Sequence, residues 1–233
     1  MEIKEAIILA GGLGTRLRDV VPDLPKCLAP VAGKPFLYYV IDHLSKQGIE
    51  KFIFAVGYKR DKIEEFLEHL SIPIHWQVSI ETEPLGTGGA VKLACSKAVD
   101  PTVLVLNGDT LFRVDAHELA TFHERKQSDC SLSLKPLKNF ERYGVVELNP
   151  DESVKSFQEK KFYPAGLING GVYALQVDSF LKENLPTVFS FEKDWLEKFY
   201  SLRPMYGLEQ DEYFIDIGIP EDFERAQHEF SSF

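Results

Sequence analysis

Residues 6–35, AIILAGGLGTRLRDVVPDLPKCLAPVAGKP, combine a glycine-rich turn with two cations in a spacing that suits phosphate chemistry. The apolar residues 7–9 predict a buried strand that runs directly into glycines at positions 11, 12 and 14. Glycines after a strand leave backbone N–H groups uncovered and can adopt positive φ, so they can wrap a phosphate chain. Arg16 adds a bidentate fork and Lys26 adds a point charge. The segment therefore predicts a triphosphate-binding site.

Neither of two common phosphate-binding motifs accounts for this turn. A Walker loop carries Lys and then Ser or Thr directly after its second glycine, whereas Gly14 is followed by Thr15 and Arg16. A dinucleotide fingerprint that starts at Gly12 needs a glycine at position 17, which is Leu17. A plain strand-to-helix turn with a surface arginine is the alternative interpretation, but the complete spacing favours a binding site.

The same residues resemble the signature of the sugar-1-phosphate nucleotidyltransferases (nucleotide-sugar pyrophosphorylases), which reads approximately GGxGTRL, a gap, and PKxLxPVxxKP. Every element of that signature is present between Gly11 and Pro35, and later motifs of the family follow in order along nearly the whole chain. The resemblance implies transfer of a nucleotidyl group from a nucleoside triphosphate to a sugar 1-phosphate, with release of pyrophosphate. It also implies a fold of the nucleotide-diphospho-sugar transferase type.

A second glycine-rich loop, ETEPLGTGGA, spans residues 81–90 and precedes a predicted helix. Its N–H groups and the helix N-terminus suit a base edge or phosphates, although Pro-x-Gly alone indicates only a turn. In the family a similar loop reads the base. The nucleotide-binding residues that the resemblance implies are Leu9, Ala10, Gly11, Gly12, Gly14, Thr15, Arg16, Lys26, Glu83, Pro84, Gly86, Thr87, Gly88, Asn107, Gly108 and Asp109.

Two aspartates are candidates for binding a divalent metal. Asp109 follows an apolar strand, at the carboxyl end where α/β proteins place their sites. Asp216 has apolar neighbours in YFIDIG and is expected at another strand end. A turn or a cap is the alternative role for each, but both match the metal-binding aspartates of the resembling family. Two carboxylates with substrate phosphates suit Mg²⁺, which is therefore the expected cofactor.

Two further motifs, QEKK at residues 158–161 and LINGGVY at residues 167–173, match sugar-binding motifs of the family. By themselves a charged run indicates a solvated face, and NGG indicates a turn. The resemblance implies that Glu159 accepts from sugar hydroxyls, Lys160 faces the sugar phosphate and Asn169 holds ring oxygens. The complete expected sugar-binding set is Tyr143, Gly144, Glu159, Lys160, Asn169 and Gly170.

The composition limits the classes of protein to consider. At 233 residues the chain can build one α/β domain with a full core. A net charge of −10 at pH 7 argues against a nucleic-acid or anionic-membrane partner. Three cysteines without a CxxC motif indicate reduced thiols in a cytoplasm. No signal-peptide pattern and no apolar run of membrane-spanning length is present, so a cytoplasmic protein is expected.

Apolar periodicity predicts alternating strands and helices in the first half of the chain. Strands are expected at residues 6–9, 52–56, 74–80 and 102–106, with helices at 36–46, from the cap Asp61 to 70, and at 89–98. Such alternation implies an α/β fold with a doubly wound, mostly parallel, Rossmann-like sheet. The second half predicts shorter, partly antiparallel strands at 131–134, 144–148, 154–157 and 171–175, with helices at 177–183, 191–199 and 220–230.

We expect this second half to form a sugar-binding lobe on the same sheet. No repeat or linker interrupts the chain, so residues 1–233 are expected to be a single nucleotidyltransferase domain. Within this domain, the nucleotide-binding half is expected at about residues 1–115 and the sugar-binding half at about residues 116–233.

The implied chemistry is a direct displacement. The attacking sugar-phosphate oxygen is already an anion, so the reaction needs alignment and charge neutralisation rather than a general base. Arg16 is expected to hold the leaving pyrophosphate, Lys26 to stabilise charge at the α-phosphorus and Asp109 to bind the metal, which makes these three the candidate catalytic residues. A non-catalytic nucleotide-sugar sensor is the alternative, but such a protein is expected to lose one of them. Homo-oligomerisation is left open.

The identity of the base and the sugar depends on fewer residues. Glu81 and Glu83 stand where thymidylyltransferases and some uridylyltransferases carry glutamine. A carboxylate accepts from N1–H and N2–H of guanine, whereas uracil and thymine offer one such donor. Two solvated glutamates are the alternative interpretation.

Five segments, EPLGTGGA, FERYGVVE, FQEKK, GLINGGVY and YFIDIGIPEDF, resemble the D-glycero-D-manno-heptose 1-phosphate guanylyltransferases, which make GDP-heptose for bacterial surface glycans. GTP and a manno-configured heptose 1-phosphate are therefore the expected substrates. Mannose 1-phosphate, or N-acetylmuramic acid 1-phosphate with UTP, are the alternatives.

Overall fold

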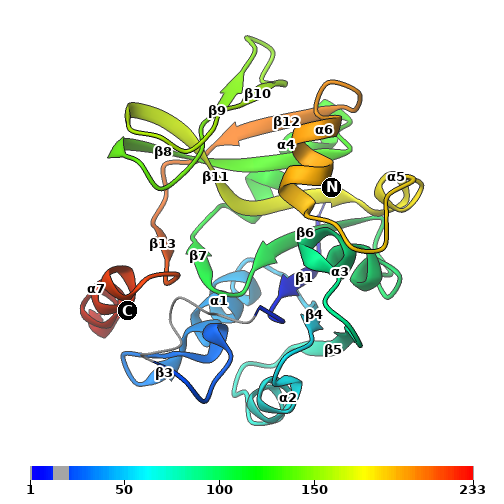
Figure 1. Ribbon diagram of the computed structural model, residues 1–233. Coiled ribbons are helices and arrows are strands. Elements are labelled where there is room, and N and C mark those ends of the chain that lie inside the picture. The colour runs from blue at the N-terminus through cyan, green and yellow to red at the C-terminus, as the bar shows by residue number, and fades with distance from the viewer. Residues whose placement is uncertain (1, 13–20, 233) are drawn as a thin grey trace.

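A seven-stranded sheet forms the centre of the protein, whose computed structural model describes residues 2–12 and 21–232. Across the sheet the strands follow the order β12 (Met205–Glu209), β8 (Cys130–Phe140), β11 (Tyr163–Gln176), β6 (Thr102–Asn107), β1 (Glu5–Leu9), β4 (Lys51–Val56) and β5 (His75–Ile80), as Figure 1 shows. All neighbours are parallel except β11, which runs antiparallel to both β6 and β8. The mostly parallel sheet expected from the sequence is confirmed.

The strand order also predicts where a ligand binds. From β1 the chain adds β4 and β5 on one side and then returns to add β6 on the other side. In doubly wound sheets such a reversal opens a crevice at the carboxyl ends of the two strands that flank it, which here are β1 and β6.

Helices cover both faces of this sheet because successive strand residues point to opposite sides. Ile8 and Phe54 belong to one hydrophobic cluster, whereas Ile7 and Ile53 belong to another. The first cluster includes side chains of α1 (Phe36–Ser45), α2 (Arg60–Glu68), α4 (Ala116–Lys126) and α7 (Pro220–Glu229). The second includes side chains of α3 (Gly86–Cys95), α5 (Val177–Leu181) and the π-helical turn η3 (Phe191–Leu196), which continues into α6 (Glu197–Phe199). No described helix combines the length and apolarity that a membrane crossing requires.

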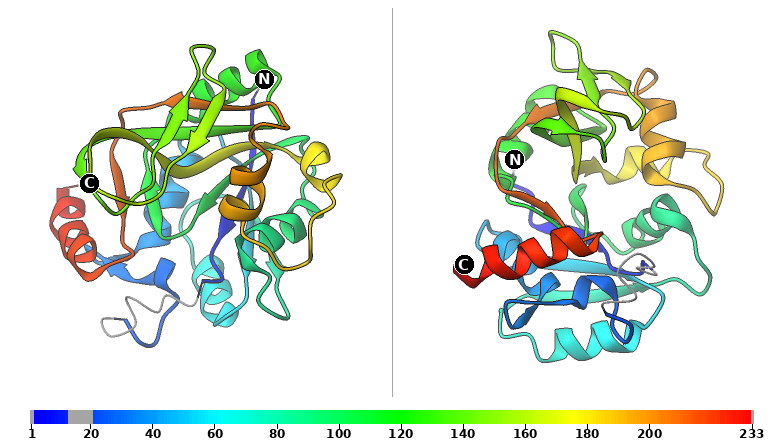
Figure 2. Two further views of the ribbon diagram at one scale, coloured as in Figure 1. Left: turned by 45° about the horizontal axis from the view of Figure 1, so that its top comes forward. Right: turned by 60° about the vertical axis from the view of Figure 1, so that its left-hand side comes forward.

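Three small two-stranded sheets accompany the main one. They pair β2 (Pro30–Val31) with β3 (Lys34–Pro35), β7 (Thr110–Phe112) with β13 (Phe214–Asp216), and β9 (Val146–Leu148) with β10 (Val154–Phe157). The last pair stands away from the main sheet at the top of Figure 1. In the views of Figure 2, α7 (red) returns to the first half of the chain (blue). There Gln227 hydrogen-bonds to the backbone of Pro30 and Ala32.

Several elements differ from the sequence-based expectations. Asp61 is not the cap of α2: the helix follows Lys59, which has a φ of +52°, and Asp61 lies in the first turn. Helix α3 begins at Gly86 rather than at residue 89. Strand β11 has 14 residues, many more than the expected 171–175. Helix α4 was not predicted, although its cap Asp115 accepts from the backbone N–H of Glu118, three residues on, as capping motifs do.

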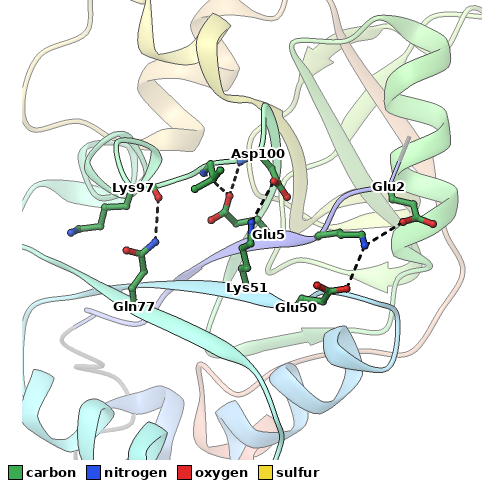
Figure 3. A network of polar contacts seen from close by, with 9 residues as sticks. Glu2, Glu5, Glu50, Lys51, Gln77, Lys97 and Asp100 are labelled. Carbon is green, nitrogen blue, oxygen red and sulfur yellow. Dashed lines mark hydrogen bonds and ion pairs between the residues drawn. The ribbon is translucent and has the colours of Figure 1, made fainter.

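A buried carboxylate fixes the end of the sheet that is remote from the crevice. Glu5, 1% exposed, accepts hydrogen bonds from the N–H groups of Val99 and Asp100, and Asp100 forms an ion pair with Lys51 (Figure 3). A buried carboxylate is tolerated when its oxygens are hydrogen-bonded in this way. Glu5 thereby ties the connection between α3 and β6 to the start of β1.

Candidate active site

A cavity of about 520 Å³ opens at the carboxyl ends of the parallel strands. Its described lining residues are Leu9, Ala10, Gly11, Gly12, Lys26, Cys27, Glu81, Pro84, Gly86, Thr87, Ala90, Asn107, Asp109, Asp216 and Gly218. Most of these belong to the expected nucleotide-binding set. Gly14, Thr15 and Arg16 of that set lie outside the described residues.

Strand register brings the separate motifs together at this cavity. Leu9, the last residue of β1, pairs with Asn107, the last residue of β6, and the N–H of Gly108 donates to Leu9 O at 2.9 Å. Glu81 follows β5, and its N–H donates to Val56 O at the end of β4. Because parallel strands end at the same edge, residues far apart in sequence become neighbours there.

Lys26 and the two candidate metal-binding aspartates form one cluster. Lys26 Nζ lies 2.5 Å from Asp109 Oδ2 and 3.6 Å from Asp216 Oδ1. Lys26 begins the 3₁₀ turn η2 (Lys26–Leu28). The aspartates converge because β7 and β13 pair antiparallel next to them, with Asp216 opposite Thr110, and the N–H of Ile217 donates to Asp109 O.

The electrostatics of the cluster suit a cation. Burial raises the pKa of Asp216 above its usual value, and the nearby charge of Asp109 raises it further, whereas Lys26 lowers it. The described residues contain no group of three or more His, Cys, Asp or Glu side chains placed to hold a metal. Two carboxylate donors nevertheless fit Mg²⁺, which takes one or two carboxylates and completes its shell with water and substrate phosphates.

Glu81 is the glutamate of the second loop that faces the cavity. Its Oε2 accepts from the N–H of Leu85 at 3.0 Å, and burial raises the pKa of its carboxyl group. A Cβ at Gly11 would lie 3.0 Å from Glu81 Oε1 and 3.0 Å from the Gly57 nitrogen, so glycine allows the two loops to approach. Glu83, by contrast, is exposed and is not among the described lining residues.

Gly88 has a structural environment that the sequence did not indicate. It is buried, and its N–H donates to Phe189 O at 2.9 Å. That N–H is therefore engaged within the protein rather than turned toward a phosphate. The role of Gly88 in nucleotide binding stays a prediction, and it would have to involve atoms other than this N–H.

Tyr143 and Gly144 of the expected sugar-binding set lie on the side of the Lys26, Asp109 and Asp216 cluster where β13 packs. The ring of Tyr143 meets Phe214, of strand β13, edge-on at 5.8 Å between centroids. Burial raises the pKa of Tyr143 to about 12, and the charge of Asp216 contributes to this rise. Arg142 pairs with Asp222 of α7 and lies over the Tyr143 ring. A Cβ at Gly144 would collide with the carbonyl oxygen of Gln158.

Asn169 and Gly170 lie in an irregularity of β11, where the strand carries two extra residues relative to β8 between the pairs Asn169–Leu134 and Tyr173–Leu132. Asn169 Oδ1 accepts from the N–H of Gly171, and its Nδ2 donates to Tyr173 Oη at 2.8 Å. A Cβ at Gly171 would lie 2.9 Å from Nδ2 of Asn107, so the bulge abuts the cavity wall.

Glu159 and Lys160 are exposed in the connection between β10 and β11. None of the six expected sugar-binding residues, all of them in the described part of the chain, lines the cavity itself. Cys27, Ala90 and Gly218 line it without having been predicted. A signal existed only for Gly218, which directly follows the Asp216 motif and whose N–H donates to Asp216 Oδ1.

The protein thus combines a mostly parallel α/β sheet with a crevice that contains a lysine between two aspartates. The model of the family Nucleotidyl transferase matches residues 5–232, and the chain belongs to that family.

The names of two relatives give a more specific activity than the family name does. The chain is 48% identical to D-glycero-alpha-D-manno-heptose 1-phosphate guanylyltransferase of Aneurinibacillus thermoaerophilus, over 98% of this chain and 99% of that protein. It is 45% identical to the enzyme of the same name from Campylobacter jejuni, over 94% and 96% of the two chains. A crystal structure of HddC from Yersinia pseudotuberculosis complexed with GMP-PN superimposes with a TM-score of 0.89 at 37% identity, covering 98% of this chain and 100% of that chain.

Proposed function

We propose that this protein transfers a guanylyl group from GTP to D-glycero-alpha-D-manno-heptose 1-phosphate, forming GDP-heptose and pyrophosphate. The observation that carries the proposal is a single cavity that is lined both by the carboxylate of Glu81 and by the cluster of Lys26, Asp109 and Asp216. The guanylyltransferase relatives and the GMP-PN complex of HddC support the same substrates.

The residues of the cluster have separate roles in this proposal. Lys26 stabilises the negative charge that develops around the α-phosphorus, and Arg16 holds the leaving pyrophosphate. Asp109 and Asp216 are the residues that hold Mg²⁺. When bound there, Mg²⁺ supplies neutralisation and alignment of the phosphate oxygens. The attacking sugar-phosphate oxygen is already ionised, so no side chain has to remove a proton.

Base recognition is assigned to Glu81 rather than to Glu83. Guanine presents N1–H and N2–H on one edge, and a carboxylate accepts from both. Glu81 lines the cavity, and the N–H of Leu85 holds its Oε2 in place, whereas Glu83 is exposed. Burial raises the pKa of Glu81. Hydrogen bonds from the N–H groups of guanine have the opposite effect, because they favour the ionised carboxylate.

The test is pyrophosphate release with GTP, ITP, UTP and dTTP against heptose, mannose and N-acetylmuramic acid 1-phosphates. ITP lacks the N2 amine, so the wild type should prefer GTP, and Glu81→Gln should reduce that preference by roughly tenfold or more. Glu83→Gln is the matched control and should leave the preference unchanged. Faster turnover with UTP or dTTP than with GTP contradicts guanylyl transfer, and faster turnover with mannose 1-phosphate contradicts the choice of sugar.

The remaining proposals concern the organisation of the protein and where it acts. We propose that the chain is one nucleotidyltransferase domain, since the main sheet runs through both halves and α7 of the second half packs on the first.

The sugar phosphate is proposed to bind near Tyr143, Gly144, Asn169 and Gly170, with Glu159 and Lys160 approaching from their exposed connection. A cytoplasmic location agrees with three buried, free thiols.

A further inference from the structure

A segment from the second half of the chain holds the base loop from outside the cavity. We call residues 81–88 the base loop and residues 187–192 the clamp segment. Two backbone hydrogen bonds join them: the N–H of Phe189 donates to Leu85 O at 3.0 Å, and the N–H of Gly88 donates to Phe189 O at 2.9 Å. The clamp segment therefore pairs with the loop much as a short strand would, although no described cavity-lining residue belongs to it.

Thr87 is the side chain that joins the two segments. Its hydroxyl donates to Glu192 Oε2 at 2.9 Å and accepts from the N–H of Phe191 at 2.8 Å. Glu192 also accepts from the hydroxyl of Ser190 at 3.2 Å. The single O–H donor of Thr87 is thus directed to the protein. Thr87 lines the cavity, but its hydrogen bonds make it an anchor for the loop.

The glycines of the base loop are explained by the same contact. A Cβ at Gly86, where φ is +71°, would lie 2.5 Å from Phe189 O, and a Cβ at Gly88 would overlap the Phe189 ring. Positive φ and missing side chains let the clamp segment approach the loop backbone directly. The glycine pattern at this site thus reflects protein packing at least as much as ligand binding.

The clamp segment is in turn fixed in the core. Phe189 and Phe191 are 3% and 1% exposed, and Phe191 contacts the rings of Tyr173 and Trp195. The hydroxyl of Ser190 caps the π-helical turn η3 by accepting from the N–H of Lys193. The clamp segment therefore has anchor points in the core besides its contacts with the base loop.

We propose that the clamp segment positions the base loop for nucleotide binding, with Thr87 and Glu192 as positioning residues that need not contact the nucleotide. This inference rests on the proposed function, because it assumes that the base loop reads the base. It assigns to Glu192, a residue of the second half, an effect on the affinity and selectivity for the base rather than on the phosphate chemistry.

The experiment compares Thr87→Val, Thr87→Ser, Glu192→Ala and Glu192→Gln with the wild type. Thr87→Val and Glu192→Ala should raise KM for GTP by roughly tenfold and reduce the preference for GTP over ITP, while kcat changes less than about twofold. Thr87→Ser and Glu192→Gln can retain the hydrogen bonds, so KM for GTP should rise less in each than in Thr87→Val or Glu192→Ala. The matched control is Glu197→Ala, which removes an exposed carboxylate from the neighbouring α6.

Hydrogen–deuterium exchange without nucleotide separates this proposal from the proposed function. Peptides that cover residues 85–91 should exchange faster in Thr87→Val and Glu192→Ala, whereas peptides of β1 and β6 should not change. Unchanged exchange, or faster exchange with an unchanged KM for GTP, overturns the positioning role. A different outcome is that hydrogen exchange in the variants responds as expected but the wild type shows no preference for GTP. In that case guanylyl transfer is the assignment that fails. The KM values of the variants and the wild type are then compared for the nucleotide that the wild type prefers.

Discussion

Lys26 and Asp109 form an ion pair with 2.5 Å between Nζ and Oδ2, and both side chains are largely shielded from solvent. The ammonium group also lies 3.6 Å from Asp216 Oδ1, so it occupies the space between the two carboxylates that are proposed to hold the metal. A substrate phosphate offers Lys26 another anionic partner. Nucleotide binding and metal binding should therefore be linked through the position of this one side chain.

Replacing Lys26 by methionine tests that linkage directly. Lys26→Met removes the competing cation and leaves two carboxylates close together, so the protein without nucleotide should bind Mn²⁺ on the order of tenfold more tightly than the wild type. Free Mn²⁺ measured by electron paramagnetic resonance reports the affinity. GTP should increase Mn²⁺ affinity in the wild type much more than in the variant. Equal affinities in the absence of nucleotide would contradict the linkage.

Lys26→Ala tests the catalytic role of the same residue. Lys26 is proposed to stabilise charge at the α-phosphorus, so kcat should fall by roughly 10²-fold or more, while the affinity for GTP changes much less. Steady-state pyrophosphate release and calorimetric GTP binding provide the two numbers. Unchanged pyrophosphate release would place Lys26 outside the catalytic machinery.

Asp109→Asn tests the proposed metal site. Asparagine keeps the size of the side chain but removes the charge, so turnover should fall at least ~10²-fold with little effect on folding. Asp222→Asn, which removes a carboxylate paired with Arg142 rather than with Lys26, is the comparison and should have a smaller effect on turnover. Full activity of Asp109→Asn, or activity that persists in EDTA, would refute the assignment of the metal to this site.

The sequence was most informative where a motif and a strand end coincide. Asp109 follows β6 and Asp216 ends β13, and both were predicted from their apolar neighbours together with the match to the metal-binding aspartates of the resembling family. Their convergence depends on the pairing of β7 with β13, two strands of three residues each. Elements this short leave almost no periodic signal, so their pairing could be inferred only from the family resemblance.

The base loop shows where sequence reasoning reached its limit. Glycines at residues 86 and 88 predict a turn. The same glycines are expected whether the turn contacts a phosphate or another part of the protein. Their packing partner, Phe189, is about one hundred residues away and lies in a segment without a regular pattern. Long-range packing of an irregular segment cannot be read from local periodicity, so the contact between Gly88 and Phe189 was not predicted.

The three cysteines should be unreactive in the folded protein. Burial raises the pKa of Cys27 to about 12 and of Cys95 to about 12, and it raises the pKa of Cys130 well above its usual value. A thiol reacts as its thiolate, so a disulfide reagent such as DTNB should modify the native protein slowly near pH 8. The same reagent in denaturant should detect three thiols. One rapidly modified thiol in the native protein would contradict the buried environment of that cysteine.

His123 should make stability depend on pH. It is 3% exposed, its Nδ1 lies 3.0 Å from Ser131 Oγ, and its Nε2 has no hydrogen-bond partner within the described part of the chain. Burial lowers the pKa of His123 to about 4, from a usual value of about 6.5. The unfolded chain therefore takes up a proton at a higher pH than the native protein does. The stabilisation by the neutral imidazole is complete above about pH 6.5 and is lost as the pH falls toward 4.

The shift corresponds to about 3 kcal/mol of unfolding free energy, most of it lost by about pH 4.5. His123→Phe keeps an aromatic side chain but cannot be protonated, so its unfolding free energy should fall less steeply between pH 7 and pH 4.5 than that of the wild type. Urea titrations at four or five pH values measure both slopes, and carboxylates contribute equally to the two proteins. His75→Phe, at an exposed position, should keep the wild-type slope. Identical slopes for His123→Phe and the wild type would show that this imidazole is not held neutral by burial.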